Sequence, residues 1–210
     1  MLFLIIFLLT ISKSFSQKET YNCLIMGVPQ YLLINGIRID IDKSLNKSNR
    51  WVVISPQFYY ANDYAMTDIG YRDFEIKKVI GGGTGLEYKY VFSTQSNAKG
   101  IYISTGLSYN YFKITTDGIT WVPETTGALT LVQREGTFNT RINKIGIQST
   151  IGYCSELFDK FLVDVFIGFG LRLCLDDTPG DSFTDLSTYA GDYGYSGTTL
   201  VTGIRFGLGY

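Results

Sequence analysis

The stretch Phe161 to Leu173, with the sequence FLVDVFIGFGLRL, decides the fold class. Its odd-numbered positions are all apolar: Phe161, Val163, Val165, Ile167, Phe169, Leu171 and Leu173. Its even-numbered positions are mixed: Leu162, Asp164, Phe166, Gly168, Gly170 and Arg172. Successive side chains of a β-strand point to opposite faces, so this period of two predicts a strand with one continuous apolar face.

The same alternation recurs along most of the chain, and no segment past residue 20 has the pattern of a long amphipathic helix. We predict eight strands, near 22–28, 31–42, 50–60, 84–94, 100–112, 141–153, 160–173 and 198–210. The fold class expected from them is all-β.

The links between these strands alternate in length. Those at 43–49, 95–99 and 154–159 are short, and those at 61–83, 113–140 and 174–197 are long. In an up-and-down meander this order places all short turns at one end, which is typical of outer-membrane barrels. We therefore predict an eight-stranded antiparallel up-and-down transmembrane β-barrel.

The second face of the strands indicates what the barrel encloses. It combines glycine with isolated charges of both signs, whereas a water-exposed face would be rich in Lys, Glu and Thr. A narrow lumen filled by side chains accounts for both features. We expect a lumen charge network that plugs the barrel, made of Arg38, Asp40, Glu87, Lys89, Lys144, Asp164, Arg172 and Arg205. The alternatives are a small-solute or ion pore, and a soluble exported barrel that binds a hydrophobic ligand.

The N-terminus has the features of an export signal. Leu2 to Ile11 is an apolar run that is too short to span a membrane as a helix, and the small residues Ser14 and Ser16 suit cleavage before Gln17. We predict a signal peptide over 1–16 and a barrel domain over 17–210. An uncleaved anchor or a buried core segment is the alternative.

Composition excludes several classes of function. The chain has no histidine, so it cannot build a Ser-His-Asp triad or a His-ligated metal site. Its 18 Lys and Arg against 19 Asp and Glu give no basic patch for nucleic acid. The spacing of Cys23, Cys154 and Cys174 matches no zinc or redox motif, and we interpret them as isolated small hydrophobes. We expect no catalytic residues, no metal and no cofactor.

Two local motifs have both a functional and a plain interpretation. Gly81 to Gly85 could cradle a phosphate, but no Lys-Ser/Thr follows, and we predict a flexible loop. The link 174–197 could bind calcium, but its spacing lacks the regular ladder of a calcium loop, and we predict a solvated surface loop. Its acidic residues are Asp176, Asp177, Asp181, Asp185 and Asp192.

Three segments carry a resemblance to a known family. NGIRID at 35–40, GIYISTGLSY at 100–109 and GIRFGLGY at 203–210 resemble small outer-membrane β-barrel proteins of the Bacteroidetes type, similar in architecture to the OmpA-type barrel. The resemblance implies a barrel in the cell outer membrane, inserted by the outer-membrane assembly machinery, with a terminal aromatic as part of the insertion signal. Leu208 and Tyr210 fit that signal. We also expect a monomer in contact with outer-membrane lipid. The family has no single activity, so we expect a non-enzymatic structural or interaction role through long external loops, toward a partner that the sequence does not identify.

Overall fold

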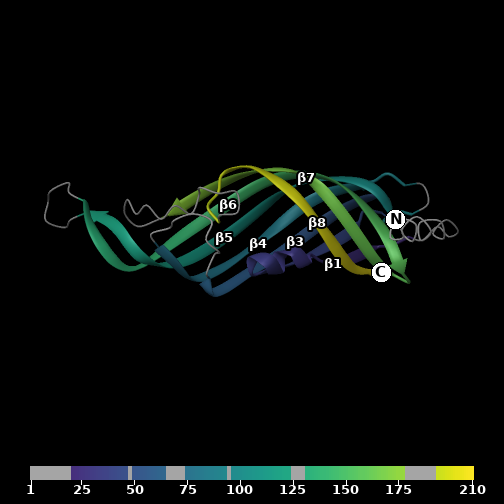
Figure 1. Ribbon diagram of the computed structural model, residues 1–210. Coiled ribbons are helices and arrows are strands. Elements are labelled where there is room, and N and C mark those ends of the chain that lie inside the picture. Colours follow the sequence, from purple (N-terminus) through teal and green to yellow (C-terminus); the bar gives the residue numbers. More distant parts are fainter. Residues whose placement is uncertain (1–19, 47–48, 65–73, 94–95, 124–130, 178–192) are drawn as a thin grey trace, which may run out of the picture.

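Eight antiparallel strands form one closed barrel in the computed structural model, which describes residues 20–46, 49–64, 74–93, 96–123, 131–177 and 193–210. Each strand pairs with its neighbours in sequence, and β8 pairs with β1 (Figure 1). The strands are β1 (Cys23–Gly27), β2 (Gly36–Ser44), β3 (Arg50–Tyr64), β4 (Phe74–Val91), β5 (Gly100–Pro123), β6 (Leu131–Phe158), β7 (Phe161–Asp177) and β8 (Gly197–Gly209). The predicted fold, an all-β up-and-down barrel of eight strands, is confirmed.

The apolar stripe of the deciding segment lies on the outer surface of β7. Ile167 is 52% exposed, whereas Asp164 on the other face is 0% exposed. The inward and outward faces are therefore those that the alternation predicts.

The barrel has two unlike ends. At the turn end, where Tyr210 lies, the links are residues 45–49, 92–99 and 159–160. At the loop end they are 65–73, 124–130 and 178–196, together with the segment between β1 and β2. β5 and β6 run beyond the other strands at this loop end as a two-stranded hairpin (Figure 1).

The long loops predicted over 61–83 and 113–140 are wrong for most of their length. The structure continues the strands there, pairing Ile114 with Thr140 and Thr115 with Asn139. Polar side chains on both strands hydrogen-bond across the hairpin, as from Thr115 Oγ1 to Asn139 Oδ1 at 2.9 Å. Since these residues do not alternate between apolar and polar, the pattern used for prediction is missing.

Strand ends differ from prediction at the turn end as well. β6 continues to Phe158, so the turn predicted over 154–159 shortens to Asp159 and Lys160. Lys160 has a φ of 62°, in the left-handed region, and closes this tight turn.

The strand predicted over 31–42 begins only at Gly36. Residues Pro29–Ile34 instead form a 3₁₀ helix, η1, which ends at Asn35 in the left-handed conformation. Proline suits the first position of a helix, and the apolar run before Asn35 does not alternate. Leu33 of this helix is 82% exposed.

Gly81–Gly85 lies inside β4, so the predicted flexible loop is wrong. Gly81 pairs with Phe112 of β5. A Cβ on Gly81 would lie 2.9 Å from a carbon of the Phe112 ring and 2.9 Å from the carbonyl oxygen of Tyr111. Glycine is present here because a neighbouring strand and its aromatic ring approach closely.

Two predictions fall largely outside the described residues. The signal peptide over 1–16 lies there, as do Asp181, Asp185 and Asp192 of the acidic link, while Asp176 and Asp177 belong to β7. Among the described residues, no helix is long and apolar enough to cross a membrane.

Candidate functional site

All eight strands expose large apolar side chains on the outer surface. Ile25 is exposed on β1, Ile41 on β2, Ile54 on β3 and Leu86 on β4, and together with the residues below they form an aliphatic belt. The remaining strands contribute further members: Ile101, Ile103, Leu107, Ile145, Ile147, Ile151, Val165, Ile167, Leu171, Leu200 and Ile204. Contiguous exposed apolar surface of this extent is unusual for a soluble monomer.

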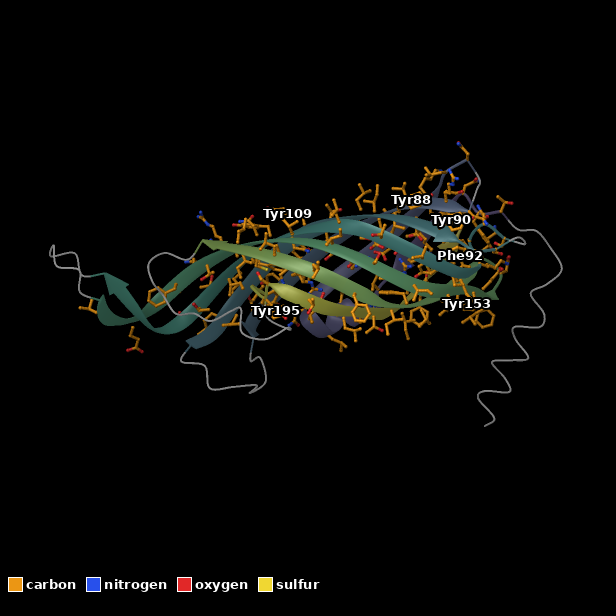
Figure 2. All side chains as sticks on the ribbon, turned by 90° about the horizontal axis from the view of Figure 1, so that it is seen from above. Tyr88, Tyr90, Phe92, Tyr109, Tyr153 and Tyr195 are labelled. Carbon is orange, nitrogen blue, oxygen red and sulfur yellow. The ribbon has the colours of Figure 1, made fainter. Side chains whose placement is uncertain are left out.

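Aromatic side chains border this aliphatic belt on both sides. Toward the turn end lie Tyr88, Tyr90, Phe92 and Tyr153, and Tyr109 lies farther toward the hairpin (Figure 2). The second group, toward the loop end, is Phe58, Tyr60, Tyr109 and Tyr111. Along β5 the aliphatic residues begin at Ile101 and give way to tyrosine at Tyr109.

The lumen is packed with buried side chains at the turn end. These are Tyr21, Leu24, Met26, Trp51, Val91, Ala98, Tyr102, Cys154, Leu162 and Phe166. The link between β4 and β5 contacts them, because Trp51 Nε1 donates to the carbonyl oxygen of Asn97 at 2.6 Å. The amide of Asn97 also exchanges two hydrogen bonds with the backbone of Tyr21.

Asp164 of β7 is the centre of a charged network above this cluster. Its carboxylate accepts hydrogen bonds from Tyr102 Oη at 2.6 Å, Arg205 Nη2 at 2.7 Å and Lys89 Nζ at 3.2 Å. Lys89 also pairs with Asp42 at 3.0 Å. The four charged groups and the tyrosine come from five strands, so the network crosses the lumen.

Asp40 extends the network toward the middle of the barrel. It lies between two arginines, 2.6 Å from Arg38 Nε and 2.9 Å from Arg205 Nη1. Arg38 Nη2 in turn lies 3.2 Å from Glu87 Oε1. Glu87 further accepts from Ser104 and Gln148, at 2.9 Å and 2.7 Å.

The structure thus joins six of the eight charged residues singled out in the sequence, namely Arg38, Asp40, Glu87, Lys89, Asp164 and Arg205. It adds Asp42 and Tyr102, which the sequence analysis missed. Asp42 shares the inward parity of Asp40, so alternation could have found it. Tyr102 is also inward by parity, but nothing in the sequence distinguishes its hydroxyl from those of other tyrosines.

Lys144 and Arg172 lie farther toward the loop end, around a cavity of ≈ 310 Å³. Arg38 and Glu87 form part of its wall, which places the cavity next to the charged network. Its other lining residues include Tyr31, Ile34, Gln57, Tyr59, Gly85, Ser108, Asn110, Phe112, Gly146, Gln148, Gly170, Tyr193 and Thr199.

A second buried apolar cluster adjoins the other side of the cavity. It contains Tyr59, Ala61, Ile76, Val79, Phe112, Ile114, Ile142 and Tyr193. The ring of Phe112 lies 4.9 Å from the ring of Tyr59 and 4.9 Å from the ring of Tyr193, measured between centroids. From the turn end outward, the lumen therefore holds an apolar cluster, a charged network, a cavity and an aromatic cluster.

The residues expected to signal insertion lie at the turn end. Leu208 and Tyr210 are exposed on the outer surface, and the backbone of Tyr210 hydrogen-bonds with that of Cys23 at 2.9 Å and 3.1 Å. None of the three cysteines, Cys23, Cys154 and Cys174, forms a disulfide. Within the described part of the chain, no group of three or more His, Cys, Asp or Glu side chains could hold a metal ion.

Comparison with known proteins assigns the chain to no family. No protein-family model matches the sequence, and no curated protein sequence is significantly similar to it. A solved structure, that of CarO from Acinetobacter baumannii, resembles the chain with a TM-score of 0.37 and 13% sequence identity, over 93% of this chain and 100% of that chain. What the protein does therefore has to be argued from its own residues.

Proposed function

We propose that this chain is a small, monomeric β-barrel of the outer membrane that acts without catalysis, with a closed lumen and its loop end outside the cell. The observation that carries the proposal is the aliphatic belt bordered by two groups of aromatic side chains. Membrane barrels have this arrangement, because aliphatic side chains face the hydrocarbon and aromatic rings lie at the two interfaces.

The length of the belt fits a bilayer. From Ile101 to Tyr111 of β5, the outward face runs from the aliphatic residues through the second aromatic group. A tilted strand needs about 9–11 residues to cross the hydrocarbon core. The polar hairpin of β5 and β6 then lies beyond the membrane, where it supports an interaction role for the loop end.

The contents of the lumen favour a closed barrel over a pore. An eight-stranded barrel is wide enough only for side chains to fill its interior or for one small ligand, and not for an open channel. Trp51, Tyr102 and Phe166 belong to the cluster at the turn end, and the neighbouring charges neutralise one another in ion pairs. We further propose that residues 1–16 are removed on export and that the assembly machinery recognises Leu208 and Tyr210.

A heat-modifiability gel on the sarkosyl-insoluble membrane fraction tests location and fold together. We expect the unheated protein to migrate differently from the boiled protein and to occur only in that fraction. Recovery of the protein in the soluble fraction would favour the exported carrier instead. Large, steady currents across planar bilayers holding the purified barrel would favour the pore.

A further inference from the structure

We propose that the lumen cavity is a binding site for a small organic carboxylate. Its carboxylate group would lie against Arg172 and Lys144, and its apolar part would pack on the rings of Tyr59, Phe112 and Tyr193. This inference adds a ligand class to a barrel whose proposed role does not require one.

The space is built into the strands. Gly85, Gly146 and Gly170 come from β4, β6 and β7 and line the cavity together. At Gly85 the atom nearest to an added Cβ is Ser55 Cβ at 3.3 Å, and at Gly170 it is Thr199 Oγ1 at 3.1 Å. Side chains rather than backbone lie nearest, and the volume of ≈ 310 Å³ is at the lower end of the range for small-molecule pockets.

The charge around this space is predominantly positive. Arg38 and Glu87 neutralise each other in an ion pair at 3.2 Å. The other two charged lining residues, Lys144 and Arg172, are both cations. They lie near each other on adjacent strands, since Arg172 pairs in register with Gly146 and Lys144 with Cys174. Among the described residues, no ion-pair partner of Arg172 is found.

A buried hydroxyl supplies an independent indication of a ligand. Thr199 of β8 lines the cavity and is 7% exposed, yet its Oγ1 has no hydrogen-bond partner in the described part of the protein. Buried polar groups are nearly always hydrogen-bonded, so an unsatisfied one beside a cavity needs a partner. A carboxylate held by the neighbouring Arg172 would accept from this hydroxyl.

The cavity wall on the loop side indicates what kind of apolar group the carboxylate ligand carries. The ring of Phe112 packs at a tilt against the rings of Tyr59 and Tyr193 within the buried aromatic cluster, and all three residues line the cavity. Such rings pack well on an aromatic or aliphatic body. The combination of two cations, one unpaired hydroxyl and three rings favours an organic carboxylate over an inorganic anion.

The test is a titration of the full-length barrel, folded in detergent micelles, with benzoate as the probe. Binding is followed by isothermal titration calorimetry, with benzylamine as the cation of matching shape and inorganic phosphate as the ion without a ring. We expect benzoate to bind and the other two to bind at least about tenfold more weakly, because a charge-assisted hydrogen bond is worth that much. Absence of benzoate binding in the millimolar range, or equal binding of benzylamine, would overturn the proposal.

Two variants and one control locate the site. Arg172→Gln should raise the Kd for benzoate about tenfold or more, and Thr199→Val, which keeps the shape but removes the hydroxyl, should raise it severalfold. Lys113→Gln removes an exposed cation of β5 outside the cavity and should leave the Kd unchanged. Heat modifiability shows that each variant is folded. Unchanged binding by folded Arg172→Gln would place the ligand elsewhere, and the measurement does not depend on where the barrel resides in the cell.

Discussion

The two halves of the lumen differ in how their charged side chains are arranged and in how completely side chains fill the space. In the half nearer the turn end, Lys89 and Arg205 alternate with Asp40, Asp42 and Asp164 in ion pairs of 2.7–3.2 Å. In the half nearer the loop end, Lys144 and Arg172 lie beside a cavity of ≈ 310 Å³. The first arrangement uses charge to hold four strands together, and the second places two cations in the wall of a cavity.

Asp164→Asn should have the largest effect that distinguishes the halves. Lys89 and Arg205 would lose a shared carboxylate that is 0% exposed, leaving uncompensated charge in the lumen. Removing one partner of a buried pair costs about 3–5 kcal/mol, so we expect the free energy of unfolding to fall by that amount. Urea titration of the barrel in lipid vesicles, followed by tryptophan fluorescence, measures it.

Glu156→Gln is the matched control for that change. Its carboxylate pairs with Lys99 at the turn end and is partly exposed. Such a pair is worth about 0–1 kcal/mol, so the loss should be correspondingly small. We also expect Asp164→Asn to leave the barrel non-conducting. Steady ion-selective currents in this variant would show that the network lines a pore.

Ile167→Arg should have the next largest effect. It tests the outer surface, where the aliphatic belt surrounds both halves of the lumen. Ile167 is in the middle of the exposed stripe of β7, and a cation near the bilayer midplane costs about 2–4 kcal/mol. Leu175→Arg, near the end of β7, should cost about 0–1 kcal/mol if it lies at the interface. If Ile167→Arg and Leu175→Arg lowered the free energy of unfolding in lipid by the same amount, the membrane assignment would be contradicted.

The sequence could predict the wall of this barrel better than its ends. Period-two alternation identified the eight strands and the face of Ile167, since a strand between hydrocarbon and lumen must alternate. It failed in the hairpin of β5 and β6, where the outward positions hold polar residues such as Lys113, Thr115 and Asn139 in place of apolar ones. It also failed at η1, because Leu32, Leu33 and Ile34 form an apolar run that propensity alone does not distinguish from a strand.

Glycine substitutions test whether the two halves of the lumen are packed equally tightly. A Cβ at Gly168, in the tightly packed part of β7, would lie 2.6 Å from Thr150 Cα, a backbone atom of β6 that can move only with its strand. We expect Gly168→Ala to lower the free energy of unfolding by about 1–3 kcal/mol. Gly85→Ala places the same methyl group 3.3 Å from Ser55 Cβ beside the cavity and should change it by less than about 1 kcal/mol. Similar costs at both positions would mean that the cavity half is as tightly packed as the other.

The cavity itself could not be predicted from the sequence. Inward parity placed Lys144, Arg172 and Asp164 in the same lumen, and the expectation was a single network. Which inward residues share a level depends on strand register, which pairs Arg172 with Gly146 and Asp164 with Arg205. Glycine opposite Arg172 offers it no partner, whereas arginine opposite Asp164 forms an ion pair with it.

Arg172→Gln should have the smallest effect on stability, and it tests whether the cations of the cavity are structural. Arg172 has no ion-pair partner among the described residues, so its removal leaves no described carboxylate unpaired. We expect the free energy of unfolding to change by less than about 1 kcal/mol. The same substitution at Arg205 removes one partner each from Asp40 and Asp164 and should cost about 3–5 kcal/mol. If the two variants unfold at the same urea concentration, positive charge stabilises both halves alike, and the distinction between a structural half and a binding half of the lumen fails.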